Sequence, residues 1–177
     1  MINWFQFLEK KGSHEYSCLM ATFPAKITNK IKKWEKKFID KDDLFTKEAD
    51  SGFETEVHIT VLYGFHDSKP DAVRELLGGP IKLVLSKTSI FETNPEYDVV
   101  KFDVQSEDLI KLNHKIRKNC EYTSDYPRYK PHCTIAYVKK GQGKKYVGDK
   151  SFEGTVVKVN ELLFSPHTGN KTKIHLL

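Results

Sequence analysis

The sequence predicts an α+β protein made of two similar halves, in which antiparallel sheets flank a central cleft. Short apolar runs typical of strands alternate with amphipathic helical segments. A strand, a helix and a histidine-bearing strand follow one another in the first half, and paired strands, a helix and a second histidine-bearing strand follow in the second. With 177 residues, 38 % of them hydrophobic, the chain 1–177 suffices for a single domain with two lobes.

The first half opens with the apolar run Tyr16–Phe23, which predicts a buried strand. Pro24 starts the helix that follows, because proline is tolerated in the first turn of a helix. The polar stretch Asp40–Glu56 predicts a long loop, and His58–Phe65 has the β-branched and aromatic content of a strand. The apolar residues of the helix recur at spacings of three and four: Ile27, Ile31, Trp34 and Phe38.

A short helix and two strands are predicted next. Ser68 with Asp71 three residues later resembles a capping box, so Ser68 is expected to cap a short helix. The runs Ile81–Ile90 and Tyr97–Val104 predict strands joined by a turn around Asn94-Pro95. The apolar residues of the short helix are Val73, Leu76 and Leu77.

In the second half, Ser106 is expected to cap a helix whose first turn is acidic. A tyrosine-rich loop, Tyr122–Lys130, leads to the strand His132–Val138. Further strands are predicted near Thr155–Phe164 and Lys173–Leu177. The buried stripe of the helix is Leu109, Leu112 and Ile116.

Composition narrows the class of protein. The 29 basic and 24 acidic residues leave a net charge of +5, which suits anionic ligands without requiring nucleic acid. The segment Met1–Lys11 lacks the pattern of a secretory signal, and no apolar stretch approaches the roughly 20 residues of a membrane span, so a cytoplasmic protein is expected. Cys18, Cys120 and Cys133 form no CxxC pair, and neither a disulfide framework nor a zinc site is expected. The basic turn Gly141–Lys145 lacks the full pattern of a phosphate-binding loop.

A repeated His-x-Thr tripeptide contains the candidate catalytic residues. His58-Ile59-Thr60 and His132-Cys133-Thr134 each lie in a predicted strand, and each precedes an apolar pair and a tyrosine. Side chains alternate along a strand, so the histidine and threonine of each motif share one face while the middle residue points into the core. If the two strands lie side by side, two imidazoles and two hydroxyls converge on a volume that fits a phosphoryl group.

Such a tetrad supports acid–base chemistry at phosphorus. One neutral histidine accepts the proton of an attacking hydroxyl, and the other, protonated, donates to the departing oxygen. The threonine hydroxyls stabilise the charge that gathers on the nonbridging oxygens. This scheme needs neither a metal nor a cofactor, and the symmetry of the motifs leaves open which histidine is the base.

The paired motifs resemble the HxT/S signatures of the 2H phosphoesterases, a superfamily of bilobal α+β proteins. The resemblance implies that His58, Thr60, His132 and Thr134 are catalytic and that the substrate is a 2′,3′-cyclic phosphate or an RNA-like linkage. More narrowly, YSCLMATFP, EVHITVLYGF and PHCTIAYV followed by NELLFS resemble the bacteriophage enzymes that degrade the cyclic di- and trinucleotides of the CBASS defence. That resemblance implies an enzyme acting in the cytoplasm of a bacterial host.

Four residues are expected to bind substrate. The narrower resemblance implies that Tyr16 stacks on a base and that Glu161 accepts hydrogen bonds from one. By chain connectivity, Ser124 and Arg128 lie near the mouth of the cleft, where the planar guanidinium of Arg128 can pair with a second phosphate. The expected ligand is a cyclic oligonucleotide, and no stable protein partner is expected.

Two alternatives remain open. The same tetrad can process RNA or tRNA ends that carry a linear 2′,3′-cyclic phosphate. A different class is a binding module that sequesters nucleotides without cleaving them. The second histidine argues against a binding module, because binding a phosphate requires hydroxyls and cations but not two opposed titratable groups.

Overall fold

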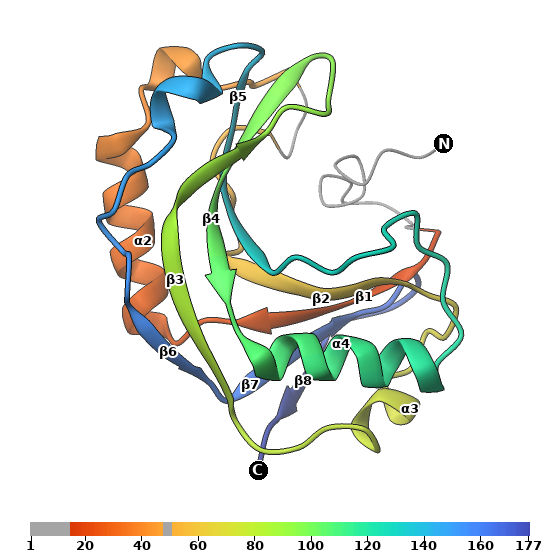
Figure 1. Ribbon diagram of the computed structural model, residues 1–177. Coiled ribbons are helices and arrows are strands. Elements are labelled where there is room, and N and C mark those ends of the chain that lie inside the picture. Colours follow the sequence, from red (N-terminus) through yellow and green to blue (C-terminus); the bar gives the residue numbers. More distant parts are fainter. Residues whose placement is uncertain (1–14, 48–50) are drawn as a thin grey trace.

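Two four-stranded antiparallel sheets form the framework of the protein (Figure 1). The computed structural model describes residues 15–47 and 51–177, so the segment Met1–Lys11 lies outside the described residues. Sheet A has the strand order β2-β1-β7-β8, and sheet B has the order β5-β4-β3-β6. This arrangement confirms the predicted α+β class with two antiparallel sheets. The strands of sheet A are β1 (Ser17–Thr22), β2 (His58–Phe65), β7 (Glu161–Ser165) and β8 (Thr172–His175). Those of sheet B are β3 (Ile81–Phe91), β4 (Tyr97–Gln105), β5 (His132–Lys139) and β6 (Val156–Val159).

The last strands cross from one sheet to the other. The predicted strand region Thr155–Phe164 divides at Asn160, where β6 ends and β7 begins. β6 pairs with β3 in sheet B, whereas β7 pairs with β1 in sheet A. The sheet that carries His58 is therefore completed by strands from the end of the chain.

Helix α2 (Ala25–Phe38) follows a strand of sheet A but packs on sheet B. The ring of Trp34 lies 5.2 Å from that of Phe102 in β4, centroid to centroid. Phe102 pairs with Cys133 in β5, and both are fully buried. The predicted apolar stripe thus covers the face of sheet B that is turned away from the side chains of His132 and Thr134.

Helix α4 (Glu107–Asn119) begins as predicted at Ser106, whose Oγ accepts a hydrogen bond from the backbone N–H of Leu109 at 3.1 Å. Its buried Asn113 donates from Nδ2 to the carbonyl oxygen of Val61 in β2, at 2.7 Å. In Figure 1 this helix runs along the lower part of the molecule, close to sheet A. Within the described ranges, no helix is long and apolar enough to cross a bilayer.

The prediction for the helix after β2 was partly wrong. Helix α3 spans only Asp71–Arg74, and its N-cap is Pro70 rather than Ser68. Proline has a fixed φ and no N–H, so it leads directly into the first turn and leaves Ser68 too far from the helix to cap it. Leu76 and Leu77 lie just beyond the helix and pack against the core.

The stretch between α2 and β2 covers the outer edge of β5. It contains a short 3₁₀ turn, Lys41–Asp43, and its backbone bonds to β5. The N–H of Phe45 donates to the carbonyl of Tyr137 at 3.0 Å, and the N–H of Tyr137 donates to the carbonyl of Gly52 at 2.7 Å. A covered edge cannot pair with other chains, and these bonds hold β5 in place.

The basic turn after β5 is anchored to a buried carboxylate. The N–H groups of Gly141 and Gly143 donate to Oδ2 of Asp98, at 2.8 and 3.1 Å, and Lys140 forms an ion pair with the other oxygen at 3.0 Å. A Cβ added at Gly143 would lie 2.8 Å from Cβ of Asp98. The turn therefore uses these amides to bind an internal anion, and its lysines belong to a structural turn.

Candidate active site

The two His-x-Thr motifs lie on neighbouring strands. β2 and β5 are the end strands of their sheets, and they run side by side where the sheets meet. His58, Thr60 and Thr134 are buried, and His132 is half-buried. The middle residue of each motif is fully buried in the core, as strand alternation requires. The structure brings the four residues together, and their catalytic role stays a prediction.

The two imidazoles are held in the same way. Nδ1–H of His58 donates to the carbonyl oxygen of Glu56 at 2.5 Å, and Nδ1–H of His132 donates to that of Lys130 at 2.9 Å. Each bond reaches the residue two positions earlier in the chain. With the proton fixed on Nδ1, Nε2 of each neutral ring keeps its lone pair for a reacting group.

The surroundings of His132 favour its neutral form. Burial lowers its pKa to about 4, and the charges of Lys101 and His58 lower it further, against the opposing effects of the Lys130 carbonyl and Asp103. The ring also meets the ring of Phe91 edge-on, with centroids 4.9 Å apart. The charge of His58 acts on this imidazole because β2 and β5 lie side by side.

A buried charged cluster lies beside His132 and was not anticipated from the sequence. Nζ of Lys101, a residue only 6 % exposed, lies 2.6 Å from Oγ of Ser89 and 2.6 Å from Oδ1 of Asp103. Burial raises the pKa of Asp103, but hydrogen bonds from Lys101 and Ser89 hold it below its usual value. In the register, Lys101 faces Thr134 and Asp103 faces His132. Paired residues on neighbouring strands point to the same face of the sheet, so the side chain of Lys101 lies on the face that carries His132 and Thr134. This position is known only from the pairing of β4 with β5.

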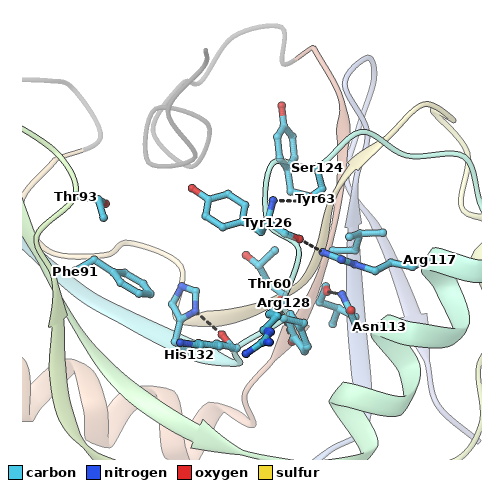
Figure 2. A pocket seen from close by; sticks show the side chains of 14 residues that line it. Thr60, Tyr63, Phe91, Thr93, Asn113, Arg117, Ser124, Tyr126, Arg128 and His132 are labelled. Atoms are coloured by element: carbon cyan, nitrogen blue, oxygen red, sulfur yellow. Dashed lines mark hydrogen bonds between the residues drawn. The ribbon is translucent and has the colours of Figure 1, made fainter.

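A cavity of about 270 Å³ opens beside Thr60 and His132, whereas His58 and Thr134 are not part of its lining. Figure 2 shows Phe91 and His132 on one side of it, with Asn113 and Arg117 of α4 on the other. The edge strand β2 contributes residues 60–63, and the loop Tyr122–Lys130 closes the space between β2 and α4. The volume approaches the range of small-molecule sites, which begins at about 300 Å³, and it fits a group the size of one nucleoside.

Two of the four predicted substrate-binding residues line this cavity. Ser124 and Arg128 border it together with Thr60 and His132. Within residues 15–47 and 51–177, the guanidinium of Arg128 has neither a hydrogen bond nor an ion pair. Tyr63, the tyrosine that follows the first His-x-Thr motif, also lines the cavity, although it was not among the residues predicted to bind substrate. Its place in the lining depends on the packing of β2 against α4.

Tyr16 and Glu161 lie outside the lining. The ring of Tyr16 stacks on His66 at 5.4 Å and meets Tyr63 edge-on at 6.0 Å. Glu161 lies beside Thr22, at the opposite end of β1 from Tyr16. At about 3.3 Å per residue, the length of β1 separates the two by roughly 20 Å, so they do not contact one base together.

Glu161 nevertheless shares the face of His58. Thr22 pairs with His58 in the register, and its Oγ1 donates to the carbonyl oxygen of Glu161 at 3.1 Å. Two strand spacings, about 10 Å, therefore separate Glu161 from His58. Its carboxylate forms an ion pair with Lys173 at 3.1 Å and lies 3.7 Å from Nδ1 of His175. The substrate-binding roles of Tyr16 and Glu161 stay predictions.

Residues that could bind a metal ion are not clustered in the described part of the chain. No group of three or more His, Cys, Asp or Glu side chains in the described part of the chain is arranged to hold a metal ion. Cys18 and Cys133 are buried free thiols, and burial raises the pKa of the Cys18 thiol to about 12. These thiols are therefore protonated and poor ligands.

Comparison with solved structures shows the same fold in other proteins. TT0787 of Thermus thermophilus matches with a TM-score of 0.62 and 15 % identity, covering 91 % of this chain and 97 % of that one. LigT of E. coli complexed with 3′-AMP matches with a TM-score of 0.60 and 16 % identity, covering 92 % and 95 %. Usb1 of Kluyveromyces marxianus with uridine monophosphate matches with a TM-score of 0.59 and 10 % identity, covering 93 % and 99 %.

A match to a family model gives a more specific assignment than the likeness in fold does. No curated protein matches the chain. The model of the 2′-5′ RNA ligase superfamily matches residues 23–151, a range that contains both His-x-Thr motifs and the loop between α4 and β5. With this match over most of its length, the chain belongs to the 2′-5′ RNA ligase, or 2H phosphoesterase, superfamily.

Proposed function

We propose that the protein is a phosphodiesterase that cleaves 3′,5′ linkages of cyclic oligonucleotides by acid–base catalysis with two histidines. The observation that carries the proposal is the matched pair of imidazoles. Both rings bond through Nδ1 to a backbone carbonyl, they lie on neighbouring strands, and His132 and Thr60 line one cavity. A fixed tautomer on each side of a phosphate is what general acid–base catalysis requires.

The reaction begins at the ribose 2′-hydroxyl next to the scissile phosphate. The base takes the hydroxyl proton while O2′ forms a bond to phosphorus. The bond from phosphorus to O5′ then breaks, and the acid delivers its proton to O5′. The products are a 2′,3′-cyclic phosphate end and a free 5′-hydroxyl, and attack by water can open the cyclic phosphate in a second step.

His132 suits the role of base in the first step. Its pKa of about 4 keeps the ring neutral at physiological pH, so Nε2 is ready to accept a proton. His58 is then the proton donor. Thr60 and Thr134, on the same strand faces, supply hydroxyl donors to the nonbridging oxygens.

The basic side chains near the cavity support a substrate with more than one phosphate. Arg128 borders the cavity with no partner among the described residues, and Lys130 borders it next to His132. In a cyclic di- or trinucleotide, a second phosphate lies one nucleotide away from the first, where these cations can neutralise it. With such a substrate, the protein would serve a phage by removing the messengers of CBASS in the host.

A second candidate is the opening of 2′,3′-cyclic phosphates at RNA ends. It is favoured by the likeness to LigT and Usb1, whose structures contain 3′-AMP and uridine monophosphate. The same tetrad performs both reactions, because opening the ring is the second step of the scheme above. The two candidates differ in substrate only.

A side-by-side rate measurement tests both. Purified protein in EDTA is incubated with 3′,3′-cyclic dinucleotides, with their 2′-deoxy counterparts and with RNA ending in a 2′,3′-cyclic phosphate, and products are identified by mass spectrometry. We expect linear products from the ribo form and none from the deoxy form. Equal cleavage of the deoxy form, or loss of activity in EDTA, contradicts the mechanism. Faster turnover of the RNA end favours the second candidate.

A further inference from the structure

Two residues of α4 that line the cavity, Asn113 and Arg117, each have a buried polar atom without a hydrogen-bond partner among the described residues. Asn113 is 1 % exposed, and its Nδ2 is used by the carbonyl of Val61. Its Oδ1 has no hydrogen-bond partner among the described residues. Arg117, one helical turn later, donates from Nη2 to the carbonyl of Tyr126 at 2.8 Å, and its buried Nε has no partner in the same part of the chain.

Such atoms are rare in folded proteins. Nearly all buried polar groups are hydrogen-bonded, and each exception needs an explanation, such as a catalytic role or a bound water or ion. Here the two residues border the cavity that contains the reactive histidine. One orphan atom is an acceptor and the other is a donor, so the end of the cavity offers a complementary pair of hydrogen-bonding positions.

We propose that Asn113 and Arg117 bind the Watson–Crick edge of a nucleobase in the substrate. Oδ1 of Asn113 accepts a base N–H, and Nε of Arg117 donates to the neighbouring carbonyl oxygen or ring nitrogen. A nucleobase is the class of group that presents a donor beside an acceptor on a flat apolar ring. This site deepens the proposed function, on which it rests.

The position of the pair agrees with the position of the reacting phosphate. Asn113 bonds to the backbone of Val61, the residue directly after Thr60. A nucleoside whose phosphate meets Thr60 and His132 therefore extends along the edge of β2 towards α4 (Figure 2). The aromatic side chains of Tyr63 and Tyr126 line the same space and give the base ring apolar surface.

Arg117 is itself held firmly. Its guanidinium lies over the ring of Tyr122, 5.3 Å from the centroid, and bonds to the loop carbonyls of Tyr126 and Pro127. These hydrogen bonds use the terminal nitrogens of Arg117. Its Nε has no partner among the described residues, and the surrounding packing holds it in place. A donor fixed in this way loses little freedom when a base binds.

Substrates that differ only at the base edge test the inference. Uridine 2′,3′-cyclic phosphate is compared with its N3-methyl derivative, which keeps the ring and both carbonyls but lacks the N–H. Adenosine is compared with N6,N6-dimethyladenosine in the same form. We expect kcat/KM of the wild-type protein to fall at least tenfold for the methylated member of one pair or both. Ratios within twofold for both pairs overturn the inference without affecting the proposed function.

Variants of α4 locate the effect. Asn113→Leu removes the acceptor, and we expect it to reduce the ratio of kcat/KM between the two substrates of each pair to about twofold. His114→Ala, an exposed neighbour on the same helix, should keep the full ratio. If Asn113→Leu also keeps the full ratio, Asn113 does not bind the base. The comparison in the wild-type protein does not depend on the folding of either variant.

Failure of the proposed function gives a different result. If no 2′,3′-cyclic phosphate and no cyclic dinucleotide is turned over, the phosphodiesterase proposal fails. Calorimetric binding of 3′-UMP and N3-methyl-3′-UMP then decides the base site by itself. At least tenfold tighter binding of 3′-UMP supports the site, and equal binding or no binding of the two overturns it.

Discussion

Gly64 of β2 and Thr123 of the tyrosine-rich loop approach so closely that a side chain has no room between them. The N–H of Thr123 donates to the carbonyl of Gly64 at 2.9 Å, and a Cβ added at Gly64 would lie 1.8 Å from the carbonyl oxygen of Thr123. Gly64 also has a φ of +110°, a conformation that favours glycine. This contact fixes the loop that forms one wall of the cavity.

Replacing Gly64 is therefore expected to damage both stability and the site. Gly64→Ala should destabilise the fold by more than the cost of a strained backbone position, which is about 1–3 kcal/mol, and should lower kcat/KM because the loop must move. Gly169→Ala is the matched control, since Gly169 has a φ of +94° but open space around its Cβ position. Urea denaturation and kinetics measure the two effects. Equal loss of stability in both variants, with activity unchanged, contradicts the role of the contact.

Removing either imidazole is expected to abolish turnover while leaving the fold intact. His58→Ala and His132→Ala should each lower kcat by about 10²–10⁴-fold, the usual contribution of a general acid or base. The double variant should lose little more, because the two groups act in one step. His114→Ala is a control for histidine loss at the surface. Retained turnover in the double variant would place catalysis elsewhere.

The pH dependence of the rate reports on His132. With a pKa of about 4, this base stays neutral until the pH falls close to that value, so kcat/KM should decrease only as the pH drops through about 4. Lys101→Met removes a cation that lowers the pKa of His132 and leaves Asp103 of β4, which raises it, against the opposing effect of His58 of β2. The acid limb should therefore move to higher pH.

A lysine away from the site controls for the change of charge. Lys111→Met on α4 removes an exposed ammonium that pairs with Glu107. Its pH–rate profile should match that of the wild-type protein. If Lys101→Met and Lys111→Met give the same acid limb, the buried cluster of Lys101, Asp103 and Ser89 has no influence on His132.

Stability should depend on pH through Glu35 of α2. This residue is 2 % exposed, its Oε2 has no partner among the described residues, and burial raises its pKa from 4.5 to about 7. The folded state holds the proton more tightly than the unfolded chain, so this contribution to stability is complete below about pH 4.5 and is lost as the pH rises through 7. Lys32 and Lys36 oppose the shift, and Glu54 adds to it.

Glu35→Gln isolates that effect. The amide cannot ionise, so it does not lose stability as the pH rises. The free energy of unfolding of the variant should therefore increase, relative to that of the wild-type protein, on going from about pH 5 to about pH 8. Urea denaturation at the two pH values measures the difference. Glu107→Gln, which changes an exposed carboxylate at the start of α4, should show no such gain. A pH dependence unchanged by Glu35→Gln would mean that another group is responsible.

The sequence predicted what depends on local pattern. Alternation along β2 and β5 placed each histidine beside its threonine, and the stripe of α2 identified its buried face. The repeat itself indicated that the two strands form one site. The alternation and the stripe follow from residues close together in the chain, where periodicity can be read directly, whereas the repeat relates two distant segments by their likeness.

What depends on strand pairing could not be predicted. Lys101 looks like an ordinary exposed lysine until β4 is aligned with β5, and Asn113 looks like a surface position of a helix until α4 is placed against β2. Ser68 failed as a cap because a proline two residues later determined the start of the helix. Pairing and packing of distant segments are set by the whole core, so single positions carry no local sign of them.

The crossing of β7 and β8 into sheet A has a consequence for how the protein is made. β1 lies between β2 and β7, so the sheet that carries His58 lacks two of its four strands until residues 161–175 have emerged from the ribosome. Both histidine motifs are synthesised well before that point. The nascent chain therefore carries both histidine motifs without the complete sheet that aligns them, and the candidate site is finished only after residues 161–175 have been synthesised.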